Sequence, residues 1–380
     1  MSALRPLGCL SILGLALVTP VRAQQAIESD ALPPSSWRLG LSVDGSWYQN
    51  LSFVTVDQRA SAWSTSGHAR LTNTRRFRTG TLALSGFGGM LYYPEADDFS
   101  QPTYGGSLNL GVASRHTQFT LGQVYSRSNT RTLWELDAEG LPLRTSDVEN
   151  ATTNLGLRHQ LSQHWQFNMG GGFTWRSYGD ERLIGGEQLS GSASLGHTFG
   201  RASSIFLAYG LTASWFDTGV TRAHQGMLGV RKGVDKGVSL ELAGGASYLE
   251  STETFYPAGH ALLSVAGRRA SFTLAYSRDF GHAFGYGRQM IGDLATARLA
   301  WTATRKLSLN AGYNFGYRRD VNDETYTIQS HIASAGFGWS IVKGLSFSGS
   351  YAWQRNVTRR VATVEGQRAT VSLSYGIDWR

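Results

Sequence analysis

Seven arginines stand at positions whose neighbours two residues away are mostly small or polar. A guanidinium group binds carboxylate or phosphate oxygens through two parallel hydrogen bonds, so such residues are suited to attracting anions. An equally open interpretation is that they pair with acids such as Asp44, Glu241, Asp279 and Asp378, or contact lipid headgroups. The seven are Arg38, Arg70, Arg158, Arg176, Arg298, Arg318 and Arg368.

Nine histidines offer further candidates, of which His68, His260 and His282 are the best placed for acid–base chemistry. Triad catalysis needs a nucleophile, a histidine and a carboxylate together. None of the three stands at a recognisable spacing from a nucleophile or a carboxylate, and no HxH or HxxxH pair suggests a metal site. The segment Gly285-Tyr-Gly287 lacks a following helix and is no phosphate cradle. We therefore predict no catalytic site, no cofactor and no metal.

The elements that carry these residues have hydrophobic side chains at every second position. Such alternation predicts β-strands with one apolar and one polar face. In 163–177 the odd positions are mostly apolar, and the even ones are polar or glycine. The pattern recurs at 205–215, 307–317, 345–353 and 371–379. Strands of soluble sandwiches run about five or six residues, whereas a tilted strand crossing a bilayer needs ~9 to 11. The lengths therefore favour strands that cross a membrane.

The first 23 residues have the features of an export signal. Arg5 supplies a positive start, Leu7 to Val18 is mostly apolar, and Val21-Arg22-Ala23 places small residues before a cleavage point. The apolar run is shorter than the ~20 residues of a membrane-spanning helix. Cys9, the only cysteine, precedes that run, so a lipoprotein signal is the weaker interpretation. We predict a signal peptide at 1–23, a short periplasmic tail at 24–36 and the folded domain at 37–380.

Short polar turns alternate with longer, irregular connections along the folded domain. Hydrocarbon cannot satisfy a free strand edge, so strands in a membrane must close into a barrel, with short turns at one end and long loops at the other. Turns lie near 73–75, 114–116, 162–164, 200–202, 233–236, 267–269, 305–306 and 342–344, and loops span 49–60, 94–102, 128–149, 179–186, 217–221, 250–259, 281–292, 318–325 and 356–365.

These connections predict the fold class: an all-β chain forming a single closed antiparallel transmembrane β-barrel over residues 37–380. Eight turns and nine loops imply 18 strands, with 16 as the other count. An even number leaves both termini in the periplasm. A propeller or soluble solenoid is the alternative, but the sequence shows no repeated motif of the kind those folds carry.

Composition excludes several function classes. The formal net charge of +8 falls to +6 once Arg5 and Arg22 leave with the signal, and the cations are scattered, so nucleic acid is not expected as a partner. No stretch of the mature chain is apolar for 18 residues, which excludes helical membrane spans. A plugged transporter of about 22 strands would need an N-terminal plug domain, for which 24–36 is too short.

Aromatic residues fall near both ends of the predicted strands, which suggests two girdles at the membrane surfaces. The girdle near the short turns comprises Trp37, Phe77, Trp165, Phe199, Trp339 and Trp379, and the one near the loops comprises Tyr48, Tyr92, Tyr93, Tyr178, Phe216, Phe280, Tyr317 and Trp353.

The mature chain resembles the bacterial outer-membrane β-barrel superfamily. The closing run from Val371 to Trp379 alternates apolar residues and ends on a penultimate aromatic, similar to the strand that the barrel-assembly machinery recognises in this class. The resemblance implies an outer-membrane location, with lipid, lipopolysaccharide and the assembly machinery as partners. With about 18 strands and arginine on the polar face, the architecture is also similar to exopolysaccharide-export barrels and to substrate-specific porins.

The polar faces predict a lumen lined by small residues, as at 190–196, 308–314, 346–350 and 372–376. A barrel of 16 to 18 strands is wide enough for an aqueous channel. We expect a porin that passes hydrophilic solutes with a mild anion preference set by the seven arginines. Its solute is an anion, a sugar or an exported polysaccharide. The alternative is a non-conducting barrel, acting as an adhesive scaffold or as an enzyme with an unrecognised site.

The loop 128–149 is unusually apolar, with Leu133-Trp134 and Leu141-Pro142-Leu143. It is a candidate for a constriction folded into the lumen. A local hairpin above the membrane, turning at 137–140, is slightly favoured.

Overall fold

The computed structural model describes residues 35–50, 61–95, 100–130, 146–200, 202–216, 219–235, 237–284, 287–358 and 362–379. In these residues the chain forms one sheet of 18 antiparallel strands. Across the same residues, no helix is long and apolar enough to cross a membrane. Residues 1–34 and 131–145 lie outside the described part, so the predicted signal peptide, almost all of the predicted tail and the centre of the 128–149 loop stay predictions.

The strands run to 12–18 residues, as membrane-crossing strands require. Their bounds are β1 Ser35–Gln49, β2 Ser61–Phe77, β3 Gly80–Tyr92, β4 Gln101–Ala113, β5 Thr117–Asn129, β6 Asp147–Gln160, β7 Trp165–Tyr178, β8 Gly186–Phe199, β9 Ser203–Phe216, β10 Gly219–Asp235, β11 Val238–Leu249, β12 Thr254–Ala266, β13 Ala270–Ala283, β14 Arg288–Thr302, β15 Leu307–Asp320, β16 Thr327–Val342, β17 Leu345–Thr358 and β18 Ala362–Trp379.

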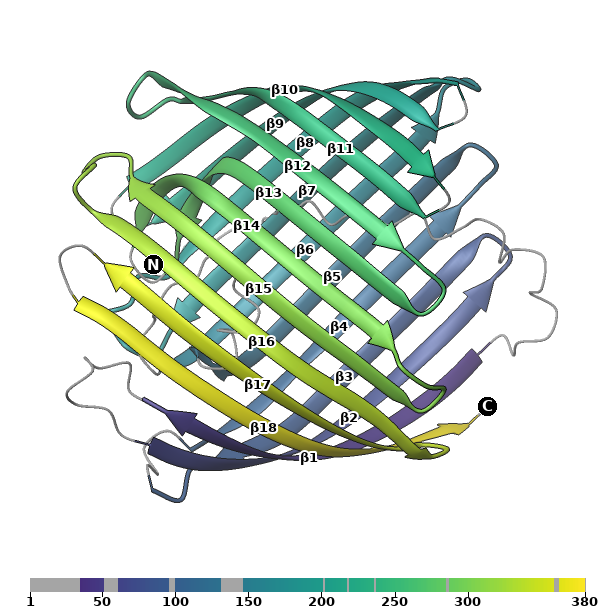
Figure 1. The fold of residues 1–380 in the computed structure, drawn as a ribbon, viewed down its shortest axis with the longest axis vertical. Helices are drawn as coiled ribbons and strands as arrows, with labels where there is room; N and C mark the ends of the chain where they lie inside the picture. Colours follow the sequence, from purple (N-terminus) through teal and green to yellow (C-terminus); the bar gives the residue numbers. More distant parts are fainter. Residues whose placement is uncertain are drawn as a thin grey trace, which may run out of the picture.

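The sheet closes on itself. Each strand pairs with the next along the chain, and β1 also pairs with β18 from Trp37 opposite Trp379 to Gln49 opposite Gln367. Figure 1 shows the tilted strands wrapping around a single barrel. Closure leaves no sheet edge to be satisfied by hydrocarbon. The predicted closed barrel is confirmed, with 18 strands rather than 16.

Connections of two lengths separate the two ends of the barrel. Even-numbered strands lead into turns of two to four residues, as between β2 and β3, whereas most odd-numbered strands lead into longer loops. The two are called here the turn end and the loop end. β1 begins and β18 ends at the turn end, with β1 starting at Ser35. A periplasmic position of this end stays a prediction.

The outward face is apolar. Large hydrophobic side chains such as Val43, 65% exposed, and Leu207, 62% exposed, point away from the barrel axis on alternate positions. In water so much exposed apolar surface would cause aggregation, but against hydrocarbon it is stable. A closed antiparallel barrel of even strand number with this outer face is the architecture of bacterial outer-membrane proteins, and that is where the chain resides.

The aromatic girdle at the turn end is where the sequence predicts it. All six of its residues are exposed, at 40% to 49% of their surface, and all lie within a few residues of a strand terminus at the turn end. Amphipathic rings prefer the interface between headgroups and hydrocarbon. This ring therefore marks one boundary of the membrane.

The girdle predicted at the loop end is partly wrong. Tyr48 and Tyr93 are 3% and 0% exposed, and they pack against Ala62 and Leu91 on the lumen side. Tyr178 and Phe216 also lie on the lumen face. The alternation that places Arg38 in the lumen places Tyr48 there as well, because both stand at even positions of β1. Tyr92 and Tyr317 do face outward.

Towards the loop end, the apolar band ends instead at aromatic side chains that form hydrogen bonds with a polar side chain on the next strand. Tyr hydroxyls and a Trp N–H need such partners when they approach hydrocarbon. The pairs are Tyr209 with His224 (2.7 Å), Tyr276 with Asp293 (2.5 Å), Tyr313 with His331 (2.7 Å), Tyr351 with Gln367 (2.8 Å) and Trp353 with Glu365 (2.7 Å).

One ladder in the wall is short. β12 and β13 pair only from Gly259 opposite Arg278 to Ala266 opposite Ser271, although β12 begins at Thr254 and β13 continues to Ala283. Pro257, which has no backbone N–H to donate, stands in the part of β12 that does not pair with β13. The two strands therefore separate towards the loop end.

Candidate functional site

The lumen face is lined by small polar side chains that hydrogen bond across strands. Ser85 bonds Ser107 at 2.8 Å, Ser346 bonds Ser374 at 2.7 Å, and Asn168 donates to Ser194 at 3.1 Å. Residues opposite one another in a ladder point to the same side of the sheet. These hydrogen bonds therefore identify which face of each of these strands points into the lumen. Small side chains leave space along the barrel axis, as the sequence predicts.

Four of the seven predicted arginines lie in the half of the lumen towards the turn end or at mid-height, and all four are exposed. Arg38 is 3.7 Å from Asp378, and Arg158 donates to Gln166 at 2.6 Å. Arg70 lies over the ring of Phe87, 5.4 Å from its centroid. Among the described residues, Arg70, Arg158 and Arg298 have no carboxylate partner. These guanidinium groups are exposed on the lumen face.

The other three arginines lie towards the loop end and are packed. Arg176 stacks over Phe284 at 5.0 Å and Arg368 over Tyr48 at 5.2 Å. Arg318 is 8% exposed and lies close enough to Asp279 for a Coulombic interaction. Arg318 fits the interpretation in which these arginines pair with acids, whereas Arg176 and Arg368 stack on aromatic rings, a role that the sequence does not suggest.

A loop crosses the lumen at the loop end. Leu183, in the connection 179–185 between β7 and β8, and Tyr178 at the end of β7 pack against a buried cluster of Met290, Tyr326 and Ile328. That cluster belongs to β14, β16 and the connection before β16, which lie on the other side of the closed sheet from β7. The loop end of the lumen is therefore narrowed by side chains that meet across it.

Aromatic and charged contacts hold this narrowing in place. Arg288 binds Asp320 at 2.5 Å and lies over the ring of Tyr326, 4.2 Å from its centroid. Phe284 packs edge-on against Phe216 with their centroids 5.7 Å apart. The two ring contacts each join a connection to a strand, through Tyr326 and Phe284, so these connections are fixed to the wall.

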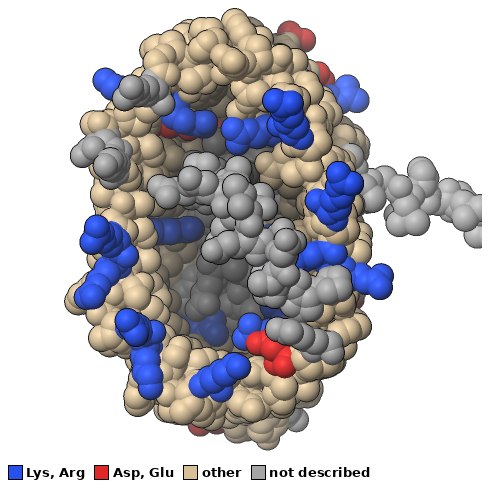
Figure 2. All heavy atoms as spheres, turned by 90° about the vertical axis from the view of Figure 1, so that its right-hand side faces the viewer, with Lys and Arg blue, Asp and Glu red and all other residues tan. Residues whose placement is uncertain are grey.

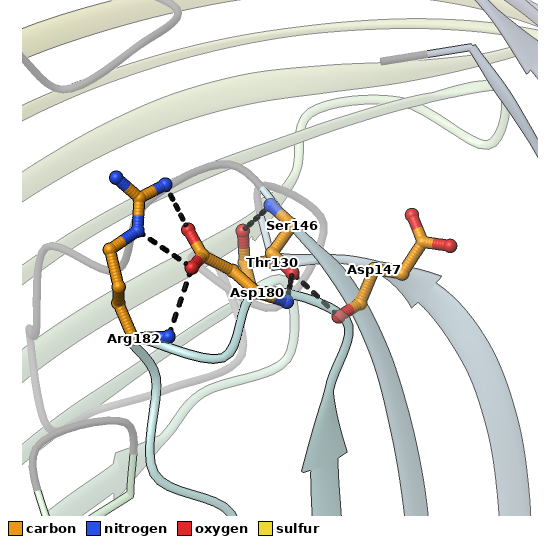
Figure 3. A network of polar contacts seen from close by, with 5 residues as sticks. All are labelled: Thr130, Ser146, Asp147, Asp180 and Arg182. Carbon is orange, nitrogen blue, oxygen red and sulfur yellow. Dashed lines mark hydrogen bonds and ion pairs between the residues drawn. The ribbon is translucent and has the colours of Figure 1, made fainter. Parts of the chain in front are cut away.

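Polar contacts tie the 179–185 connection to Thr130 and Ser146, which flank the connection between β5 and β6 (Figure 3). The backbone N–H of Asp180 donates to the hydroxyl of Ser146 at 2.9 Å, and the N–H of Ser146 donates to Thr130 at 3.1 Å. Arg182 donates to both carboxylate oxygens of Asp180, at 2.8 Å and 2.7 Å. These contacts fix the start of the 179–185 connection and bring it against the residues that flank 131–145.

The sequence offers the loop 128–149 as a candidate constriction, with a local hairpin slightly favoured, and 131–145 of this loop lies outside the described residues. The described narrowing comes from 179–185, a short connection in which the sequence predicts only an ordinary loop. The one available signal was Leu183-Ile184, an apolar pair in an otherwise polar connection. Ile184 packs against Gly287. A Cβ atom added at Gly287 would lie only 2.8 Å from the Cδ1 atom of Ile184, so this close contact requires glycine.

A charged cluster lies on the lumen wall below the constriction. Glu241 is buried, with its carboxylate 3.0 Å from the Nε2 of His260 and 2.6 Å from the guanidinium of Arg231. The sequence spacing does not reveal this carboxylate beside His260, because the residues come together only where β10, β11 and β12 pair. His260 Nδ1 has no hydrogen-bond partner in the described structure, so no nucleophile completes a triad.

His68 also has an acid and a hydroxyl nearby on the lumen wall. Its Nε2 is 3.9 Å from Asp44, and its Nδ1 is 3.3 Å from the hydroxyl of Thr103. A distance of 3.9 Å is beyond hydrogen-bond reach, so the carboxylate does not hold the ring as a triad requires. The side chain of His282, the third candidate, lies outside the described residues.

A small cavity of about 60 Å³ adjoins His260 where β12 and β13 separate. Thr212, Gln225, Ser247 and Ser277 contribute to its lining. Its size suits one or two waters or a hydroxyl group and not a whole substrate. Among the described residues, no group of three or more His, Cys, Asp or Glu side chains is placed to hold a metal ion.

Comparisons with known proteins find similar structures but no matching family. No family model matches the chain, and no curated protein matches it. The chain is similar to OccAB4 from Acinetobacter baumannii, with 12% identity and a TM-score of 0.47 over 92% of this chain and 99% of that one. It is also similar to two proteins from Pseudomonas aeruginosa. These are OpdQ, with 11% identity and a TM-score of 0.49 over 91% and 98%, and the outer membrane protein OpdK, with 12% and 0.47 over 90% and 99%. At such values the likeness carries no argument here, and the barrel rests on its own strand pairing.

Proposed function

We propose that the chain is an outer-membrane channel that passes hydrophilic solutes with a preference for anions. The observation that carries the proposal is the set of exposed arginines, Arg70, Arg158 and Arg298, on the lumen face of a closed 18-stranded barrel. Such a barrel encloses enough space for an aqueous path. Cationic side chains facing that path lower the energy of an anion within it.

Hydroxyl-bearing solutes such as sugars or polysaccharides also suit the lumen. The lumen face carries hydroxyl and amide side chains such as Ser346, Ser374 and Asn168. Hydroxyls and amides both donate and accept hydrogen bonds, so they can exchange them with the hydroxyl groups of a sugar. This supports a solute with many hydroxyl groups and leaves export and uptake equally open.

Conductance of the purified protein in a planar bilayer under a salt gradient tests the channel. We expect discrete open steps and a reversal potential that reports anion preference. Replacing Arg70, Arg158 and Arg298 together by Ser should move the reversal potential towards zero, because the exposed cations are then removed. Arg176→Ser is the matched control and should leave it unchanged, since Arg176 is stacked on Phe284. An unchanged reversal potential in the triple variant would contradict the anion preference.

A non-conducting barrel is the second candidate, and the narrowing at the loop end favours it. Tyr178 and Leu183 meet the opposite wall there, and fixed contacts of this kind could close the path. Conductance is measured for the natural chain and for a variant with Leu183 and Ile184 replaced by Ser. If both form intact barrels and neither shows open conductance steps, the result would support a scaffold that presents its loops. Steps in either protein would support the channel.

A further inference from the structure

The eight turns at the turn end carry only one sign of charge. The connections 78–79, 114–116, 161–164, 200–202, 236–237, 267–269, 303–306 and 343–344 contain nine Lys or Arg and no Asp or Glu. The nine connections at the loop end contain six Lys or Arg against fourteen Asp or Glu. Figure 2, which looks onto the turn end, shows Lys and Arg side chains around its rim. The barrel is therefore charged oppositely at its two ends.

The turn cations are available for binding. Those that the structure describes are all exposed, and none of them forms an ion pair in the described residues: Arg78, Arg115, Arg268, Arg269, Arg305, Lys306 and Lys343. Lys306 donates to the carbonyl of Ile341 at 3.2 Å, which leaves its charge uncompensated. These seven residues are called here the basic rim.

Several outward-facing cations at the loop end are, by contrast, already paired. Arg127 is 3.0 Å from Asp147, Arg222 is 3.6 Å from Glu250, and Arg278 is 3.5 Å from Asp293. An anion arriving at these sites would have to displace a carboxylate. The basic rim requires no such displacement.

The depth of the basic rim is set by the aromatic girdle beside it. Trp37, Trp165 and Trp339 stand at the turn-end termini of their strands, where their rings mark the edge of the hydrocarbon. The turns follow directly, at the level of lipid headgroups. Two further exposed cations, Arg75 and Lys232, stand on the outward face next to the turns, opposite Leu82 and Leu240.

We propose that the basic rim binds the phosphate groups of anionic phospholipids in the membrane leaflet that surrounds the turn end. Cations near an anionic membrane surface are attracted to it, by about fivefold in affinity per charge. The outward positions of Arg75 and Lys232 favour lipid over a solute at the channel mouth, because those two side chains leave the barrel on its lipid side. The rim would hold the barrel at a fixed depth, whatever solute passes through it.

Native mass spectrometry of the full-length barrel in a neutral detergent tests this surface. The barrel is titrated separately with phosphatidylglycerol and with phosphatidylcholine, and bound lipids are counted. We expect phosphatidylglycerol to bind on the order of tenfold more tightly, and to lose this advantage as salt rises, because the attraction is electrostatic. The variant Arg268→Ser, Arg269→Ser, Arg305→Ser, Lys306→Ser should lose most of the preference.

The matched control replaces four cations at the loop end by Ser, namely Arg127, Arg182, Arg222 and Arg319, each of which has a carboxylate partner. This control should keep the preference for phosphatidylglycerol. Equal losses in both variants, or no preference in the natural chain, would overturn the proposal. If the four-residue turn variant does not fold, as judged by heat-modified gel mobility, the pair Arg268→Ser and Arg269→Ser with the salt titration gives the same decision.

A solute at the mouth is the competing occupant. A sulfated oligosaccharide is added as the probe to the barrel loaded with phosphatidylglycerol. Displacement of the lipid from the natural chain and from the loop-end control alike, at an ionic strength at which sodium chloride alone leaves the lipid bound, would overturn the lipid assignment and place an anionic solute at the rim. Retention of the lipid supports the proposal. Neither result depends on whether the channel conducts.

Discussion

The two ends of the barrel are built from the same strands but form different environments. At the loop end, arginines stack on rings or bind carboxylates, and the side chains of Tyr178, Leu183 and Met290 meet across the lumen. At the turn end, cations are exposed and the lumen wall carries serine and glycine. The alternation along each strand is the same at both ends, so the difference comes from the connections. Long loops bring partners to the wall, and short turns cannot.

This comparison teaches that an arginine on the polar face of a strand has no fixed role. Arg158 and Arg176 stand on neighbouring strands with the same parity, yet one donates to Gln166 and is exposed while the other is packed under Phe284. For this pair, what decides is that Phe284, in the connection between β13 and β14, reaches Arg176. Selectivity should therefore be sought at the turn end and at mid-height, and rigidity at the loop end.

The largest expected effect is on the packing at the loop end. Met290 is fully buried between Tyr326 and Ile328, so Met290→Ala leaves a cavity and should lower the free energy of unfolding by about 3 kcal/mol. Met227→Ala, on the lumen face at mid-height and only half-buried, should cost about 1 kcal/mol. Urea titrations in detergent micelles measure both. Equal losses would show that the two regions are packed alike.

A smaller effect is expected on conductance. Replacing Leu183 and Ile184 by Ser removes the apolar contacts of the crossing connection, so single-channel conductance should rise by roughly twofold as the path widens. Leu161→Ser, in the turn between β6 and β7, is the control at the turn end and should leave conductance unchanged. If both variants conduct as the natural chain does, the narrowing does not lie on the solute path.

The smallest effect concerns pH. A hydrogen bond from His224, together with Arg222, lowers the pKa of Glu250 below its usual 4.5. A lowered pKa contributes stability above pH 4.5 that is lost as the pH falls through the shifted value. The natural chain should therefore be more stable than Glu250→Gln near neutral pH, and the difference should shrink in urea titrations below pH 4.5.

Glu253→Gln is the matched substitution three residues along, where the described structure shows no ion pair. It should give no pH-dependent difference. Because the turns contain no acid, the turn end offers no counterpart to this dependence. An equal pH profile for both variants would place the effect outside the His224–Glu250 contact.

Period-two alternation and the two lengths of connection were enough to predict the barrel, its 18 strands and its turn-end girdle. Hydrocarbon imposes these features on the sequence directly, residue by residue. The lumen position of the seven arginines followed from the same parity. Their division into exposed and packed groups did not, because Phe284 and Tyr48 reach Arg176 and Arg368 from elsewhere in the chain.

The contacts between strands and across the lumen likewise could not be predicted from the sequence. Glu241 and His260 are nineteen residues apart and meet only because β11 and β12 are adjacent in a particular register. Leu183 meets Ile328 only because the barrel closes. Pattern within one strand carries no information about partners on another, and loop conformation depends on both.

The short ladder between β12 and β13 has a consequence for how the wall comes apart. Backbone amides that are not locked into a ladder exchange their hydrogens with water through small local openings. Residues 254–258 still pair with β11 and residues 279–283 with β14, so only their amides that face the gap are unpaired. In deuterium-exchange experiments these amides should label before the rest of the wall, and mechanical or thermal unzipping should start between β12 and β13. A cysteine pair that clamps them would then delay the loss of the whole barrel more than the same clamp placed at any other pair of strands.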